Sequence, residues 1–182
     1  HEIRVPTGGG RKLVRFPSPM GELPVYYTGH AESVSLPRNL PGLTEVTLHG
    51  GVQPAYIPLL VMLLGRTGLF NTHERRKKAA DFFYRIEGLF GAGGLDKSVG
   101  RVDVSGLHQG RTARRTYTYE GHIGQITAIP CVVAALWEIG GGFRDIPGGV
   151  YSPERLLADP DPFLAEVMRR GVEIFFYEDG LD

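Results

Sequence analysis

The sequence predicts a single α+β domain spanning residues 1–182, with a mainly antiparallel, open-faced sheet and helices packed on one side. Strand-like and helix-like segments do not alternate strictly, which argues against a doubly wound parallel sheet. A hydrophobic share of 42% supplies one full core, and 182 residues leave no room for a second large domain. The 26 glycines and 13 prolines lie between periodic segments, so they punctuate many short elements.

Short extended segments come first. Residues 11–16 and 24–27 are strand candidates between turns. Residues 45–49 alternate apolar and polar side chains, with Val46 and Leu48 on one side, which predicts a half-buried strand.

Two helices are expected next. The apolar run 54–64 stops at Gly65, short of the roughly 18 to 20 residues that a membrane span needs, so we expect a core helix and no membrane partner. Residues 73–90 place apolar side chains at three- and four-residue spacing opposite a basic cluster, which predicts an amphipathic helix.

A hairpin follows, with strands at 101–105 and 112–119 and a glycine-rich tip at 106–110. The second strand has two faces, one carrying Arg115, Tyr117 and Tyr119, the other Arg114, Thr116 and Thr118. Because neither face is rich in valine or leucine, we expect the sheet to meet solvent, a ligand or another subunit.

In the last third, residues 121–130 lead into 131–139, and a long apolar helix kinked by its interior Pro130 is expected. Trp137 is expected to pack in the core, and Cys131 is expected to be buried and unreactive. Two further helices are expected to start at Ser152-Pro153-Glu154 and Asp161-Pro162-Phe163, where a capping residue precedes a proline. A final strand is expected at 172–177.

Charge and cysteine content limit the partners and the location. Twenty basic residues balance twenty acidic ones, so no global field concentrates polyanions and we expect no nucleic-acid partner. The single cysteine cannot form an intramolecular disulfide, which favours a reducing, cytoplasmic location. The chain opens at His1 rather than Met, as expected of a piece cut from a longer protein, and a tag remnant would explain His1 equally well.

The sequence contains no self-contained catalytic, nucleotide-binding or metal motif. The run Gly8-Gly9-Gly10 lacks the spaced glycines, following helix and downstream acid of a dinucleotide site. None of the six histidines stands at metal-ligand spacing from another histidine, a cysteine or an acid. We therefore expect no metal and no cofactor bound by this domain, and no catalytic residue is assigned.

Two segments carry richer chemistry. Tyr27, His30 and Glu32 place a phenol, an imidazole and a carboxylate at one strand-to-turn corner ahead of Arg38. The structural alternative is that the aromatic ring covers a core and the glutamate caps a helix.

The second segment is 121–127, where small residues at a helix start leave backbone N–H groups free to meet a carboxylate. Gln125 and Thr127 would add hydrogen bonds. The structural alternative is helix-to-sheet packing that needs small residues.

Three stretches together carry a family resemblance: Val25 to Glu32 with Leu36-Pro37-Arg38, Gln125 to Ala128, and Gly148 to Glu154 ahead of Phe163-Leu164 and Arg170 to Glu173. They resemble the C-terminal, non-Rossmann domain of saccharopine dehydrogenase-like proteins. The resemblance runs from Pro24 to Tyr177, although each motif is short.

The resemblance implies a parent oxidoreductase whose N-terminal Rossmann domain binds NAD or NADP, while this domain supplies substrate contacts and a homodimer surface and is inactive by itself. Family members reduce an imine formed between an amino group and a keto acid, or run the reverse oxidation, so small amino-acid and keto-acid substrates are implied, as in lysine metabolism. The residues expected to contact substrate are Tyr27, His30, Glu32, Arg38, Gln125 and Thr127. The hydride chemistry itself belongs to the nicotinamide.

Other functions remain open. A polyamine-pathway relative such as carboxynorspermidine dehydrogenase is one alternative within the family. A non-catalytic domain that keeps only ligand binding or dimerisation is another. A hydrolase or transferase using His30 and Glu32 as acid and base is weakened by the lack of a nucleophile or metal beside them.

Overall fold

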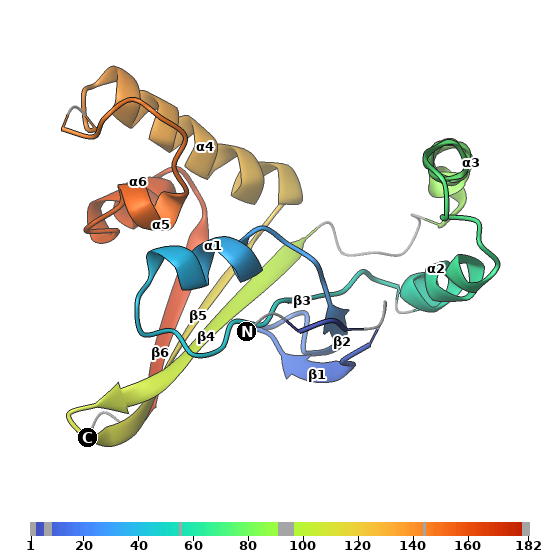
Figure 1. Cartoon of the computed structure of the whole chain (residues 1–182), viewed down its shortest axis with the longest axis horizontal. Helices are drawn as coiled ribbons and strands as arrows, with labels where there is room; N and C mark the ends of the chain where they lie inside the picture. Colours follow the sequence, from blue (N-terminus) through green and yellow to red (C-terminus); the bar gives the residue numbers. More distant parts are fainter. Residues whose placement is uncertain (1–2, 6–8, 55, 91–96, 144, 180–182) are drawn as a thin grey trace. The chain divides into compact units, whose positions relative to one another are not determined.

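The structure is a computed structural model that describes residues 3–5, 9–54, 56–90, 97–143 and 145–179. Its elements in chain order are β1 (Lys12–Arg15), β2 (Glu22–Tyr27), α1 (Glu32–Asn39), β3 (His49–Gly50), α2 (Tyr56–Arg66), α3 (His73–Phe90), β4 (Ser98–His108), β5 (Arg111–Gly121), α4 (Ile123–Ile139), α5 (Pro153–Leu156), α6 (Asp161–Arg169) and β6 (Glu173–Asp179). The predicted α+β class with antiparallel pairing is confirmed. The described strands form two three-stranded sheets rather than one, in the orders β1-β2-β3 and β4-β5-β6 (Figure 1).

The contacts divide the chain into two compact units. The first unit comprises His1–Val14, Glu22–Ser33 and Thr47–Leu95, and the second comprises Arg15–Gly21, Val34–Val46 and Asp96–Asp182. The single-domain expectation stays a prediction. In the described part of the chain, no helix has the length and apolar content to cross a bilayer.

In the first unit, β2 pairs with β3 so that Tyr27 lies opposite His49. The predicted strand at 45–49 is wrong except for its last residue, because the pairing with β2 begins only at His49. Alternating apolar and polar side chains are compatible with a strand, but a strand forms only where a neighbouring strand pairs with it in register.

The two helices of the first unit are α2 and α3. Helix α3 has the predicted bounds. Helix α2 is present, but its prediction as a core helix is wrong: it has no buried residue, and Leu63 is 61% exposed. Apolar composition favours burial, but burial also requires a second apolar surface to pack against.

In the second unit, β4 and β5 form a hairpin of eleven facing pairs. The glycine-rich tip predicted at 106–110 is wrong, because both strands continue to the pair His108 and Arg111. Only Gln109 and Gly110 make the turn, with φ of 49° and 80°. Two successive positive φ angles match the right-handed twist of the strands, as in tight hairpins.

The core of the second unit lies where α4, α6 and β6 meet. It consists of the buried Val133, Val167 and Val172, with Ile126, Ile129, Trp137, Phe163 and Ile174 packed against them. Trp137 meets Phe163 edge-to-face at 5.5 Å between ring centroids, so its predicted core position is confirmed. Helix α4 begins at Ile123, within the segment 121–127 expected to start a helix, and Pro130 lies inside it as expected.

The predicted burial of Cys131 is wrong, because its side chain is exposed. Cys131 lies two residues from the fully buried Val133, and two residues are about 200° of turn on an α-helix. The thiol is therefore on the side of α4 that faces away from the core.

Helix α1 was not among the predicted elements. It contains Pro37, and its last residue, Asn39, joins it to α5. The Asn39 side-chain amide donates to Ser152 Oγ at 2.9 Å and to Glu154 Oε1 at 3.1 Å. Burial by itself would raise the pKa of Glu154, but hydrogen bonds, including those from Ser152 and Asn39, lower it to about 2.

The register of β4, β5 and β6 defines two faces of the second sheet. One face carries Val102, Val104, Arg115, Tyr117, Tyr119, Ile174 and Phe176. Its Ile174 end packs against the core, and the part with Val102, Val104, Arg115, Tyr117 and Phe176 is called the open face. The threonine face carries Arg101, Asp103, Thr116, Thr118, Glu120 and Glu173. On the threonine face Thr116, Thr118 and Glu120 of β5 are buried, while Phe175 and Tyr177, which lie opposite Thr118 and Thr116 on β6, are 41% and 55% exposed.

Candidate functional site

The corner at the end of β2 holds two rings together. The Tyr27 ring lies 4.6 Å from the His49 ring, tilted by 30°. Gly10 lies against the other ring atoms of Tyr27, since a Cβ on Gly10 would come within 2.1 Å of Tyr27 Cε2. Burial first, and then the positive charge of Lys12, lower the pKa of His49, which disfavours the charged imidazolium in the stack. Tyr27 thus has a packing role at this corner.

His30 and Glu32 form a pair, with His30 Nδ1 hydrogen-bonded to Glu32 Oε2. Both side chains are about half exposed. The chain is fixed around them by Ser33, whose hydroxyl donates to the His30 carbonyl at 2.7 Å. When Nδ1 donates to the carboxylate, Nε2 is the ring atom that can exchange a proton with a ligand. The predicted imidazole and carboxylate are therefore brought together.

Glu32 is also the acidic residue in the first turn of α1, so the structural alternative of a helix-start glutamate applies to it as well. Arg38 is in the last turn of the same helix and is exposed. Tyr27, His30 and Glu32 belong to the first unit, whereas Arg38 belongs to the second.

The start of α4 is already capped by its own chain. The ring nitrogen Nδ1 of His122 accepts a hydrogen bond from the Gly124 N–H at 3.1 Å, and the His122 carbonyl accepts from the N–H of Gln125 at 2.9 Å. The N–H groups of Gly124 and Gln125, which were expected to be free for a carboxylate, are therefore already hydrogen-bonded. Gln125 and Thr127 are exposed, but two residues of helix separate their directions by about 200°, so they do not face one common ligand.

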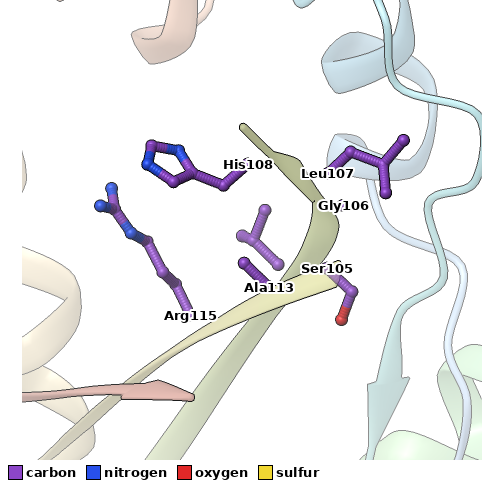
Figure 2. Close-up of a pocket in the computed structure, with 7 residues that line it drawn as sticks. Ser105, Gly106, Leu107, His108, Ala113 and Arg115 are labelled. Carbon is purple, nitrogen blue, oxygen red and sulfur yellow. The ribbon is translucent and has the colours of Figure 1, made fainter. Parts of the chain in front are cut away.

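The hollow beside the end of α4 and the hollow at the tip of the β4–β5 hairpin include none of the six predicted substrate contacts. The hollow beside α4, of about 350 Å³, has Glu138, Phe143 and Tyr151 in its wall. The hollow at the hairpin tip has a volume of about 200 Å³. Figure 2 shows His108 and Arg115 extending to one side of the hairpin, above Ala113, while Leu107 points away.

A charged cluster occupies the threonine face. The Asp103 carboxylate accepts from Arg101 Nη2 at 3.0 Å, from Arg114 Nη2 at 2.9 Å and from the Thr116 hydroxyl at 2.7 Å. Arg101 also donates to the carbonyl of Arg15 at 2.8 Å. These bonds hold the segment at Arg15 on this face and place two guanidinium groups on one carboxylate.

Farther along the same face, Glu120 is buried and pairs with Lys97, with 3.0 Å between Oε1 and Nζ. The hydrogen bond and the charge of Glu120, and then the charge of Glu173, raise the pKa of Lys97. The other oxygen of Glu120, Oε2, and the hydroxyl of Thr118 are buried without a hydrogen-bond partner among the described residues.

The sequence contained a signal for this second cluster. Thr116, Thr118 and Glu120 follow one another at period two, which assigns them to one face of a strand. A polar set at period two is ambiguous, because it fits a solvated face and a buried polar face equally well. Which face is closed depends on the segments packed against it, and these are distant in sequence.

Comparison of the chain with known proteins finds no matching protein-family model and no matching curated protein.

Proposed function

We propose that this chain is the substrate-binding and dimerisation domain of an NAD(P)-dependent oxidoreductase that acts on an imine formed between an amino acid and a keto acid. The proposal includes a cytoplasmic location, an N-terminal Rossmann domain in the same protein and a homodimer. It rests on the resemblance to saccharopine dehydrogenase-like proteins together with the surface and site geometry of the described residues.

The observation that carries the proposal is the open face. Val102 and Val104 are each half exposed, and Tyr117 and Phe176 stack at 4.8 Å between ring centroids. Arg115 lies over the Phe176 ring at 6.0 Å. Exposed aromatic and aliphatic side chains beside an arginine are typical of the central part of a subunit interface. A second copy of the chain is the partner that a homodimer would place there.

The His30–Glu32 pair supports the substrate-binding half of the proposal. A half-exposed imidazole fixed by a carboxylate can donate to, or accept from, a carboxylate or amine of a bound substrate. Hydride transfer needs a nicotinamide, and the sequence lacks the glycine fingerprint for one, so catalysis requires the Rossmann domain.

Activity is tested on the full-length gene product. We expect it to oxidise NADH or NADPH when supplied with a matching amino acid and keto acid, and the isolated chain to bind neither nucleotide by calorimetry. His30→Gln is expected to lower kcat/KM at least about tenfold, a loss of roughly 1.4 kcal/mol of transition-state stabilisation. The matched control is His73→Gln, an exposed histidine at the start of α3, which is expected to leave kcat/KM unchanged. Micromolar binding of NAD(P)H by the isolated chain contradicts the proposal.

Dimerisation is tested by sedimentation equilibrium. Val104→Lys places a charge on the open face and is expected to weaken self-association by at least about tenfold. Leu107→Lys is the matched control, because Leu107 is 79% exposed and belongs to the opposite face of the same strand. Equal association of both variants and the parent chain contradicts the use of the open face.

A further inference from the structure

Two buried polar atoms on neighbouring inward positions of β5 have no hydrogen-bond partner among the described residues. Thr118 is 3% exposed and Glu120 is 8% exposed, and the atoms concerned are Thr118 Oγ1 and Glu120 Oε2. An unsatisfied buried polar group costs about 1–3 kcal/mol, so proteins rarely keep one without a purpose. Two such atoms on one strand face, two residues apart, call for a common explanation.

Two carboxylates and one ammonium lie nearest to these atoms. Glu120 lies directly opposite Glu173 in the β5–β6 register, and like charges at facing positions repel. Lys97 contributes a single positive charge against these two carboxylates, and it binds the Oε1 side of Glu120. Arg101, which faces Thr118 from β4, is held by Asp103. Close to the free acceptors, two carboxylates thus face one ammonium, although the second guanidinium on Asp103 keeps the charges of the whole face balanced.

We propose that Thr118, Glu120 and Glu173 form a binding site for a primary ammonium group. An ammonium carries three N–H donors and one positive charge, which match the two unsatisfied acceptors and the second carboxylate. The Lys97 ammonium already sits 3.0 Å from the other oxygen of the same carboxylate. A metal ion is a poorer match, because the described residues contain no group of three His, Cys, Asp or Glu side chains suited to one.

Lys97 is the exposed partner of the buried Glu120, so a ligand would approach the site at Lys97. The Lys97 side chain is 46% exposed, while the Glu120 side chain that it contacts is 10% exposed. Its four-carbon stem is flexible, so it can move aside without a change in the sheet. The inference deepens the proposed function, on which it rests for the identity of the amine: the amino group of an amino-acid substrate or of a diamine.

A binding role and a structural role make opposite predictions for Thr118→Val. Thr118 donates to no described residue through its side chain, so replacing the hydroxyl by a methyl group removes an unsatisfied polar atom and loses no bond. The variant is expected to be as stable as the parent, or more so, without ligand. Thr116→Val is the matched control on the same strand face, because it deletes the 2.7 Å bond to Asp103 and is expected to destabilise the fold.

The experiment uses cadaverine and lysine as probes and glutarate as a negative probe, at constant ionic strength, with calorimetry and thermal unfolding. We expect saturable binding of at least one amine, a rise in Tm of about 3–5 °C at tenfold excess over Kd, and no effect of glutarate. Thr118→Val and Glu120→Gln are expected to weaken amine binding at least tenfold, whereas Thr116→Val keeps it. Thr118→Val keeps the test decisive if Glu120→Gln fails to fold.

The inference is overturned if neither amine binds saturably, if glutarate binds as well as the amines, or if Thr118→Val leaves amine affinity unchanged. The outcome is separable from that of the proposed function. Amine binding that depends on Thr118, in a full-length protein that never oxidises NAD(P)H, supports the site and contradicts the oxidoreductase. Turnover in which Thr118→Val leaves the KM for the amine unchanged supports the oxidoreductase and overturns the site.

Discussion

The hydroxyl of Thr116 donates a hydrogen bond to Oδ1 of Asp103 across the β4–β5 pair, with 2.7 Å between the two oxygens. Burial by itself would raise the pKa of Asp103, but hydrogen bonds from Arg101, Thr116 and Arg114 outweigh it and lower this pKa to about 2 from 3.8. The carboxylate is therefore the charged centre that holds β4, β5 and the segment at Arg15 together.

Asp103 should make stability sensitive to acid. A folded pKa of about 2 below an unfolded value of 3.8 means that the charged form stabilises the fold above pH 4, and that this contribution is lost as pH falls toward 2. Asp103→Asn is expected to lower the free energy of unfolding by about 1–2 kcal/mol at pH 7, and by much less at pH 2.5, in urea titrations. Asp81→Asn, an exposed residue of α3, is the control and should change stability by less than about 0.5 kcal/mol. A loss for Asp103→Asn of equal size at both pH values would show that its charge is not the cause.

Gly10 should tolerate no side chain. Its φ is 63°, and a Cβ would lie 2.1 Å from Cε2 of Tyr27, so alanine meets both backbone strain and a clash with the ring that stacks on His49. Gly21 separates the two effects, because its φ is 64° and nothing lies within 4 Å of its Cβ position. We expect Gly21→Ala to cost about 1–2 kcal/mol in denaturant unfolding and Gly10→Ala to cost about 1–3 kcal/mol more. Equal costs would mean that the contact between Gly10 and Tyr27 does not form.

The pKa of His49 should lie below that of a free histidine and should rise when the charge of Lys12 is removed. Burial is the larger cause of its lowered pKa and the charge of Lys12 the smaller, so Lys12→Ala is expected to raise the pKa without restoring 6.5. Because the folded pKa lies below the unfolded one, the contribution of His49 to stability is present above pH 6.5 and is lost as pH falls through the folded pKa. An NMR titration of the His49 ring proton measures the shift. The same pKa in Lys12→Ala and in the parent would leave burial as its whole cause.

Local periodicity was sufficient where an element is defined by its own residues. The bounds of α3 follow from apolar spacing, and the β4–β5 hairpin follows from two β-forming runs around a glycine-containing turn. Helix α1 was missed because Pro37, a residue that usually ends a helix, lies inside it. Burial was the least predictable property. The exposure of Leu63 and the burial of Glu120 both depend on which surfaces pack together, and local pattern does not encode that.

In the candidate site, too, contacts between residues close in sequence were predictable and burial was not. His30 and Glu32 are two residues apart at a turn, and the structure pairs them. Gln125 and Thr127 are both expected to add hydrogen bonds at the helix start, yet helix geometry directs them apart. The unsatisfied acceptors of Thr118 and Glu120 become visible only when the partners of every buried polar atom are known.

Cys131 and Val133 should respond oppositely to the same substitution. The two residues lie about 200° apart around α4, so Val133 fills the core with α6 and β6 while the Cys131 thiol faces outward. Val133→Ala is expected to cost about 1–3 kcal/mol in urea unfolding, because it leaves a cavity, and Cys131→Ala is expected to cost less than about 0.5 kcal/mol. A maleimide should label Cys131 in the native chain at a rate within about tenfold of that in the urea-unfolded chain, since an exposed thiol needs no opening of the fold. Labelling that occurs only on unfolding would require α4 to be rotated about its axis. That rotation would also move Val133 out of the core. The labelling rate and the stability of Val133→Ala therefore check the orientation of α4 independently.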